Sequence, residues 1–135
     1  MSATSLFVVQ RLYAVWQAQD VRAVMKLCAD DISYTVHQRG RPDRAAFRGK
    51  GEVSSYLQAV AGAWAFEELR PGPLHYADDI VRGRVDCVAV HRPTGEVIES
   101  SRRHVWRFRG DLILSCDECG DTDLIRAFCR MVAHA

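Results

Sequence analysis

A histidine and a carboxylate on neighbouring strands form the pair in this sequence best suited to moving a proton. His104 lies in a segment with strand character over 96–109, and Gly110-Asp111 predicts a two-residue hairpin turn into a second strand over 112–119. Counting from that turn places His104 opposite Asp117. A carboxylate can orient an imidazole ring and stabilise its protonated form, so the pairing predicts an acid–base unit with His104 and Asp117 as its catalytic residues.

The same pair has a simpler interpretation. The two side chains could satisfy one another as a structural hydrogen bond, and a shift of the turn by one residue would place Asp117 on the other face of the strand. Arg102 shares a strand face with His104 and could bind an acidic ligand, or it could form an ion pair with Asp117 or Glu118. The sequence leaves these alternatives open.

Aromatic side chains could line a binding pocket for a flat or cyclic molecule, because such residues dominate many ligand sites. The substrate-binding candidates besides Arg102 are Tyr13, Trp16, Tyr34, Trp64 and Trp106. Each of them is also an ordinary core residue, so packing is the alternative role for each.

The five cysteines suggest reduced, structural thiols. Cys116 and Cys119 have the spacing of a zinc half-site or a redox pair, but the sequence holds no second pair. Residues three apart on a strand point to opposite faces, which disfavours joint ligation. No metal and no organic cofactor is therefore expected.

Elements that would position these residues follow from the apolar periodicity. Helical spacing predicts a first helix over about 4–19 and a third over 53–64, and Asp20 is a predicted N-cap for a short helix between them. A strand is predicted at 32–37 and a loop at 38–46. Later strands are predicted from residue 66 to Pro71 and at about 74–91, 96–109 and 112–119, followed by a closing helix that begins near Asp121 or Thr122. This order describes an α+β domain whose sheet can curl around a pocket.

Length and composition narrow the function classes. A chain of 135 residues with 48% hydrophobic and 26% charged content fits one globular domain over 1–135. A net charge of +1 gives no broad positive field for nucleic acid or an anionic membrane. No leader-like start and no apolar run of roughly 18 residues is present, so a cytoplasmic location is expected.

Short motifs in a characteristic order carry a family resemblance. These motifs are Val9-Gln10-Arg11, Ala18-Gln19-Asp20, Ala29-Asp30-Asp31, Phe47-Arg48-Gly49 with Val53 and Tyr56-Leu57, and Trp106-Arg107-Phe108. In this order the chain resembles the nuclear transport factor 2-like superfamily, particularly its SnoaL-like branch and its ketosteroid isomerase relatives. The resemblance implies a cone-shaped, cystatin-like α+β barrel, in which a curved mixed or antiparallel sheet wraps around the N-terminal helices. It also implies a homodimer formed through the outer face of the sheet.

The isomerase pattern does not carry over to this sequence. Its helix-one tyrosine falls on Leu12, with Tyr13 beside it, its general-base aspartate falls on Val36, and its oxyanion-hole acid falls on His104. Steroid isomerisation by that mechanism is therefore not expected. SnoaL-like cyclases use a His and an Asp on late strands, so the resemblance implies proton transfer by His104 and Asp117.

The resemblance thus implies a cofactor-independent cyclase, isomerase or dehydratase that acts on an apolar cyclic or polyketide-like molecule. It implies that Arg102, His104 and Trp106 face the cavity of the cone. The alternative is a non-catalytic ligand-binding or dimerisation module of the same fold. Epoxide hydrolysis would need an Asp-Arg-Asp relay, of which Arg102 and Asp117 supply only part.

Overall fold

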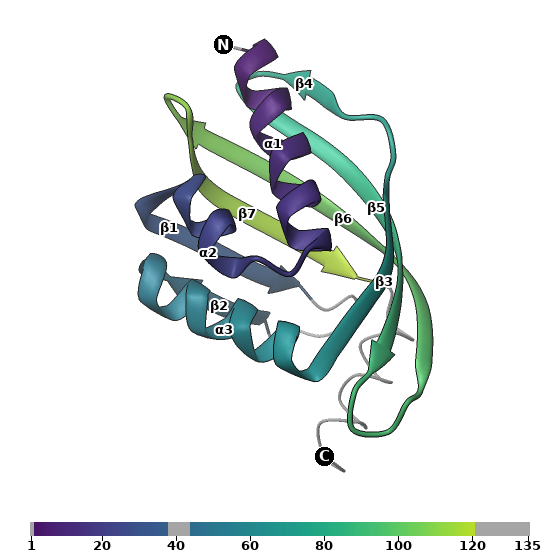
Figure 1. Cartoon of the computed structure of the whole chain (residues 1–135). Coiled ribbons are helices and arrows are strands. Elements are labelled where there is room, and N and C mark those ends of the chain that lie inside the picture. Colours follow the sequence, from purple (N-terminus) through teal and green to yellow (C-terminus); the bar gives the residue numbers. More distant parts are fainter. Residues whose placement is uncertain (1, 38–43, 121–135) are drawn as a thin grey trace.

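In the described part of the chain, seven strands form one curved sheet, and three helices cover its concave side (Figure 1). This arrangement comes from a computed structural model, which describes residues 2–37 and 44–120. The helices are α1 (Ser2–Gln17), α2 (Val21–Lys26) and α3 (Gly49–Ala63). The strands are β1 (Cys28–His37), β2 (Arg44–Arg48), β3 (Trp64–Pro71), β4 (His75–Ala77), β5 (Ile80–His91), β6 (Val97–Arg109) and β7 (Leu112–Gly120).

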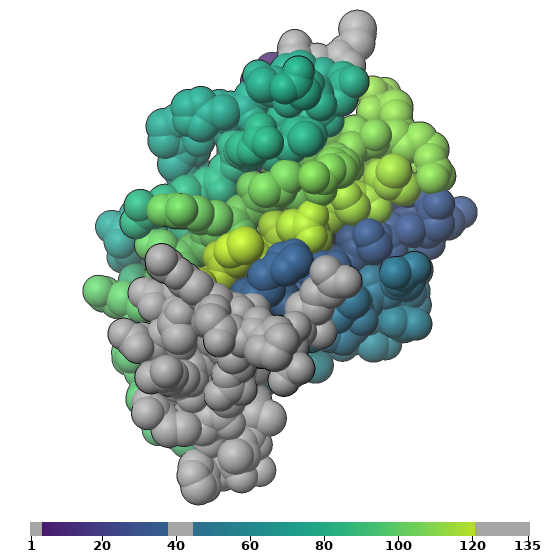
Figure 2. Space-filling model, turned by 180° about the vertical axis from the view of Figure 1, so that it is seen from behind, coloured from purple at the N-terminus to yellow at the C-terminus, as the bar shows by residue number. Residues whose placement is uncertain are grey.

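The sheet is mixed and open. Its strand order is β2-β1-β7-β6-β5-β3, with β4 paired to β5 at one side. The β1–β7 pair is parallel and every other pair is antiparallel. Figure 2 shows the convex side, where β1, β7, β6 and β5 run as neighbouring bands. The predicted α+β architecture with a curved mixed sheet is confirmed, although β2 and β3 do not pair and the barrel stays open.

Helix α1 lies across the concave face because its apolar stripe faces the core. Val9, Leu12 and Tyr13 are buried in the main hydrophobic cluster, as their helical spacing predicts. The turn after the helix contains Gln19 at a positive φ of 57°, and the Gln19 side-chain amide donates to the carbonyl of Trp64 at 2.8 Å. This bond fixes the end of α1 against the α3–β3 junction, which sets the position of the aromatic side chains on α1.

Hydrogen bonds from side-chain carboxylates mark the starts of α2 and α3. The Asp20 carboxylate accepts a hydrogen bond from the Ala23 amide at 3.0 Å, which confirms Asp20 as the N-cap of α2. At the start of α3, Gly49 has a φ of +80° and the Glu52 carboxylate accepts from the Arg48 amide at 3.1 Å. Only glycine adopts that backbone conformation without strain.

Several predicted boundaries are wrong. The predicted strand over 74–91 is a hairpin of β4 and β5, because Asp78 and Asp79 both take positive φ angles, 54° and 60°, and reverse the chain. The predicted loop over 38–46 ends earlier, since β2 begins at Arg44 and pairs with β1. The predicted closing helix lies outside the described residues. No helix in the described part of the chain is long and apolar enough to cross a membrane.

A β-bulge in β7 determines which side chains face the concave side. The turn between β6 and β7 lies where the sequence predicts it, but the pairing then slips. Ile113 pairs with Phe108 whereas Ser115 pairs with Arg107, so Leu114 is an extra residue in β7. Because side chains alternate along a strand, the extra residue exchanges the two faces of β7 beyond it.

Candidate active site

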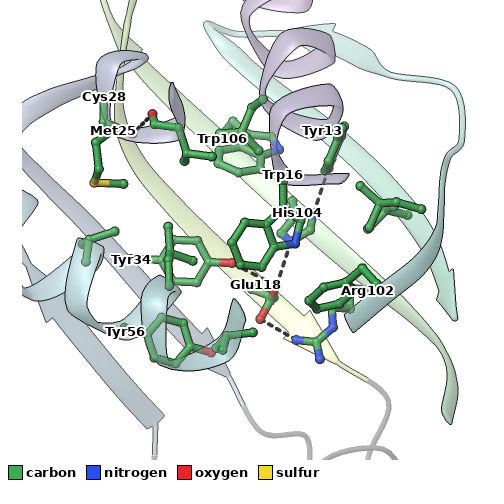
Figure 3. Close-up of a pocket in the computed structure, with 18 of the residues that line it drawn as sticks. Tyr13, Trp16, Met25, Cys28, Tyr34, Tyr56, Arg102, His104, Trp106 and Glu118 are labelled. Carbon is green, nitrogen blue, oxygen red and sulfur yellow. Dashed lines mark hydrogen bonds and ion pairs between the residues drawn. The ribbon is translucent and has the colours of Figure 1, made fainter. Parts of the chain in front are cut away.

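A pocket lies between the concave face of the sheet and the three helices. Its volume is about 760 Å³, counting the part that is open to solvent. Its apolar walls include Leu12, Trp16, Val24, Leu57, Val85 and Trp106. Six of its lining residues form what we call the polar cluster: Tyr13, Tyr34, Tyr56, Arg102, His104 and Glu118 (Figure 3). The site is thus an apolar cavity with its polar atoms gathered on one side.

His104 stands at the centre of the polar cluster. It is 6% exposed and projects inward from β6, two residues from Trp106 on the same strand face. Its Nδ1 atom lies 2.8 Å from the Tyr13 hydroxyl and its Nε2 atom lies 2.9 Å from Oε1 of Glu118 (Figure 3). Both ring nitrogens therefore have a partner, one from α1 and one from β7.

Glu118 connects the rest of the cluster. Besides His104, its Oε1 atom accepts a hydrogen bond from the Tyr34 hydroxyl at 2.9 Å, and its Oε2 atom accepts from Nη1 of Arg102 at 2.9 Å. Burial alone would raise the pKa of this carboxyl group, but the Arg102 charge and the bonds from His104 and Tyr34 outweigh it and hold the pKa far below its usual range. Glu118 is therefore an ionised carboxylate at neutral pH.

Arg102 carries the positive charge of the cluster. Burial alone would lower the pKa of Arg102, but the negative charge of Glu118 outweighs burial and raises that pKa above its ordinary value, so the guanidinium stays protonated. Its Nε atom is buried and has no hydrogen-bond partner among the described residues. Figure 3 shows the guanidinium beside Glu118 at the edge of the cavity. Arg102 can therefore still offer a donor to a ligand.

The partners of His104 determine where its protons lie. An ionised carboxylate only accepts hydrogen bonds, so Nε2 of His104 must carry a proton toward Glu118. Burial raises the pKa of Tyr13, which keeps the phenol protonated. In neutral His104 the Tyr13 hydroxyl donates to Nδ1, and in protonated His104 the Nδ1–H donates to the Tyr13 oxygen. The side chains Tyr13, His104 and Glu118 form a continuous proton path.

Asp117 does not face His104, and the predicted pairing of these two residues is wrong. Beyond the bulge His104 pairs with Glu118 and Asp117 pairs with Val105, so Asp117 points to the convex side. There its carboxylate accepts from Nε2 of His37 at 2.8 Å and from Nη1 of Arg107 at 2.9 Å. Glu118 occupies the position that the sequence argument gave to Asp117.

The structure gathers most of the predicted binding residues at the pocket. The cavity is lined by Tyr13, Trp16, Tyr34, Arg102, His104 and Trp106. Trp64 does not line it: α3 ends at Ala63, and Trp64 packs as the first residue of β3 in a separate small cluster with Ala89. The predicted helix ran one residue too far, which wrongly assigned Trp64 to the helix stripe that faces the pocket.

The sequence argument named Glu118 only as a possible ion-pair partner of Arg102, which is confirmed, and missed both its contact with His104 and the place of Tyr56 in the pocket. Glu118 could have been found from the apolar run Leu112-Ile113-Leu114, which breaks the alternation of a regular strand. Ile113 and Cys116 are both buried although they are three residues apart, as the bulge requires. Tyr56 was assigned only to the helix core, yet it lines the cavity and stacks on Phe47 with ring centroids 4.2 Å apart.

Metal ligation receives no support from the described residues. No group of three or more His, Cys, Asp or Glu side chains in residues 2–37 and 44–120 is arranged to hold a metal ion. Cys116 is buried whereas Cys119 is exposed, so the two thiols point to opposite faces of β7. Burial raises the pKa of the Cys116 thiol well above its ordinary value, which keeps it protonated.

Comparison with known proteins assigns the family. The family model described as SnoaL-like domain matches residues 9–116. The chain belongs to the SnoaL-like domain family. That match spans α1 to the middle of β7 and so contains most of the SnoaL-like pocket, though it ends before Glu118. No curated protein matches the chain.

Solved structures share the SnoaL-like architecture. A nuclear transport factor 2-like protein from Burkholderia thailandensis is 26% identical, with a TM-score of 0.72 over 89% of this chain and 92% of that chain. A candidate polyketide cyclase from Xanthomonas campestris pv. campestris is 15% identical, with a TM-score of 0.76 over 93% of this chain and 96% of that chain. TerC, co-crystallised with polyporic acid, is also 15% identical, with a TM-score of 0.76 over 92% of this chain and 96% of that chain. These likenesses establish the fold.

Proposed function

We propose that this SnoaL-like protein binds an apolar cyclic or polyketide-like molecule in its pocket and acts on it as a cofactor-independent acid–base enzyme. The observation that carries the proposal is the placement of His104 between the Tyr13 hydroxyl and the Glu118 carboxylate inside an apolar cavity. A candidate polyketide cyclase and a protein crystallised with polyporic acid share the fold, which supports a ring-shaped substrate.

Proton transfer would run through Tyr13. A substrate proton would move to the Tyr13 oxygen while the Tyr13 proton moves to Nδ1 of His104, and Glu118 would stabilise the resulting imidazolium. The reverse movement would return a proton to another substrate atom. Arg102 would stabilise negative charge that develops on a substrate oxygen, since among the described residues only Glu118 accepts a hydrogen bond from its guanidinium. Such a cycle consumes no oxidant or reductant and fits cyclisation, isomerisation or dehydration.

A substrate panel tests this proposal. It should include a β,γ-unsaturated ketone, a β-hydroxy ketone and a linear polyketide-like diketone, assayed with the wild type, His104→Gln and Tyr13→Phe. General acid–base catalysis contributes about 10²–10⁴-fold, so both variants should lose at least roughly 100-fold in kcat. His37→Gln is the matched control, because His37 lies on the convex side and pairs with Asp117. Undiminished turnover by His104→Gln would contradict the proposal.

One observation favours a second candidate, a non-catalytic ligand-binding module. Both nitrogens of His104 and both oxygens of Glu118 already have protein partners, so the cluster could act as a structural brace. Native mass spectrometry of freshly purified protein and a thermal-shift screen of apolar acids and ketones separate the candidates. Retained ligand or stabilisation without turnover of any panel substrate favours the module.

We also propose that the convex face of the sheet pairs with a second copy of the chain. Val97 is 59% exposed, and Val88, Val90 and Val105 on this sheet are only half-buried. Exposed Arg103 and Arg107 lie on the same sheet, which predicts a partly charged interface. Sedimentation should show a dimer at micromolar concentration, and a monomer alone would contradict this arrangement.

A further inference from the structure

We infer that the pocket couples the binding of an anionic ligand oxygen to the uptake of one proton by His104, and that this proton turns the Tyr13 hydroxyl from an acceptor into a donor toward the ligand. The ligand class is a flat or cyclic molecule with a carboxylate, phenolate or enolate oxygen. The inference rests on the proposed ligand-binding pocket but does not require turnover.

Arg102 provides the anchor for the anionic oxygen. Its Nη1 atom is engaged by Glu118, whereas its Nε atom is buried without a partner among the described residues. A buried charged donor that is left unpaired is costly, so an incoming acceptor gains from pairing with it. The side chain as a whole is 24% exposed and lines the cavity, so a ligand can reach the guanidinium, and contact with Nε itself requires the side chain to rotate.

The charge balance of the cluster creates the coupling. Arg102 and Glu118 cancel one another when His104 is neutral. An anion bound beside Arg102 leaves one uncompensated negative charge in a largely apolar cavity, which is costly. Addition of a proton to the cluster restores neutrality, so the anion and the proton favour each other's binding.

The proton must go to His104. The other titratable or charged groups that line the pocket come from six elements: Tyr13 on α1, Cys28 and Tyr34 on β1, Tyr56 on α3, Cys87 on β5, Arg102 on β6, and Glu118 on β7. The buried Cys116 thiol lies two residues from Glu118 on β7 and interacts with it electrostatically. Burial raises the pKa of Tyr13, Tyr34 and Tyr56, raises the pKa of Cys28 to about 11, and raises that of Cys116, so these groups already hold their protons. Glu118 remains ionised because Arg102 holds its pKa far below the usual range despite burial. Imidazole is the side chain that ordinarily changes charge between pH 5 and 8, and among the described residues His104 is the only histidine that lines this pocket.

Protonation of His104 reverses the hydrogen bond to Tyr13. Neutral His104 has a bare Nδ1, so the Tyr13 O–H points to it and only the phenol lone pairs face a ligand. Protonated His104 donates from Nδ1, and the Tyr13 O–H is released toward the ligand. The pocket then offers the ligand two kinds of donor, the Tyr13 hydroxyl and the Arg102 guanidinium. One proton therefore changes the type of ligand atom that this side of the pocket accepts.

Calorimetry with two probes of the same shape tests the inference on the full chain. 2-Naphthoate carries the anionic oxygen, and 2-naphthamide is its neutral counterpart. Titrations in MES and Bis-Tris from pH 5.5 to 7, and in HEPES and Tris from pH 7 to 8.5, pair buffers that differ in heat of ionisation and so report the protons taken up. For 2-naphthoate we expect uptake that approaches one proton within this range, and an affinity that falls by up to tenfold per pH unit as pH rises. For 2-naphthamide we expect a clearly smaller uptake.

Variants assign the proton to its residue. His104→Gln should abolish the uptake, whereas Cys87→Ala should retain it. His91→Gln is the matched control, because His91 is 1% exposed and bonds to Thr94 away from the pocket. Tyr13→Phe should retain the uptake and weaken 2-naphthoate binding by about tenfold, the loss of one hydrogen bond.

The wild-type comparison of the two probes needs no variant, so the inference stays testable if His104→Gln fails to fold. Zero uptake with 2-naphthoate at every pH, uptake that persists in folded His104→Gln, or no 2-naphthoate binding at millimolar concentration would each overturn it. Turnover of a panel substrate together with zero uptake overturns the inference and leaves the proposed enzyme intact. Proton uptake by a protein that turns over no panel substrate supports the inference and contradicts the proposal that the protein is an enzyme.

Discussion

Replacing Glu118 by Gln should destabilise the fold by about 3 kcal/mol at pH 7. The substitution keeps the shape of the side chain and an acceptor oxygen, but it removes the negative charge that forms an ion pair with Arg102. Removal of one partner from a buried ion pair costs roughly 3–5 kcal/mol. Glu118 is 5% exposed, but the Arg102 side chain is 24% exposed, so water can relieve part of the cost and the low end of that range applies.

The pH dependence of this difference follows from the depressed pKa of Glu118. Burial opposes the ionised form, yet Arg102 and the hydrogen bonds hold the folded-state pKa far below the unfolded value of about 4.3. A depressed carboxyl pKa contributes stability that is fully present above the unfolded value and is lost as pH falls toward the folded value. The gap between wild type and Glu118→Gln should therefore be present at pH 5 and above and shrink as pH falls below about 4.

Urea unfolding followed by circular dichroism at pH 3, 4, 5 and 7 measures the gap. Asp117→Asn is the matched control, because the adjacent carboxylate lies on the convex side with its side chain 34% exposed and with two partly exposed partners. Such a surface ion pair contributes only about 0–1 kcal/mol, so this variant should remain near wild type. A cost below about 1 kcal/mol for Glu118→Gln, or a gap that does not shrink in acid, would refute the reasoning.

Two further predictions concern the scaffold. Gly49→Ala should lower the free energy of unfolding by about 1–2 kcal/mol, because Gly49 has a φ of +80°. Gly62→Ala in the same helix, where an added Cβ meets nothing within 4 Å, should raise it by about 0.5–1 kcal/mol. Thermal or urea unfolding measures both variants, and equal effects would contradict the backbone argument. Cys119 is exposed and Cys116 is buried, so peptide mapping after a short treatment of native protein with iodoacetamide should find Cys119 alkylated well before Cys116; the reverse order would show that the faces of β7 are misassigned.

The fold could be predicted from the sequence because its signals are local. The helical spacing of Val9 and Leu12 predicts that both are buried, and Asp20 is recognisable as the N-cap of α2. Gly110-Asp111 provides the positive φ and the polarity that a two-residue turn needs. These patterns depend on neighbours a few residues apart. The placement of His104 on the inner face came from the family resemblance and agrees with its position beside Trp106 in the pocket.

The partner of His104 could not be predicted because it depends on one extra residue at a distance. Counting from the turn assumes an unbroken ladder, and Leu114 breaks it by forming a bulge. The shift of one residue in the pairing of β7 places Glu118, not Asp117, opposite His104. Asp117 instead has its partners on the convex side. Closure of that cluster also requires Tyr34 and Arg102 from other strands, a contact that no local pattern encodes.

The most direct test of the account is nitrogen-15 NMR of the His104 imidazole in the full chain, with and without saturating 2-naphthoate, from pH 5.5 to 8.5. His104→Gln assigns the signal. The account predicts that Nε2 carries a proton at every pH, since it faces the ionised Glu118 carboxylate, and that 2-naphthoate extends protonation of Nδ1 to higher pH. A bare Nε2, or an Nδ1 signal that 2-naphthoate leaves unchanged throughout the range, would contradict it.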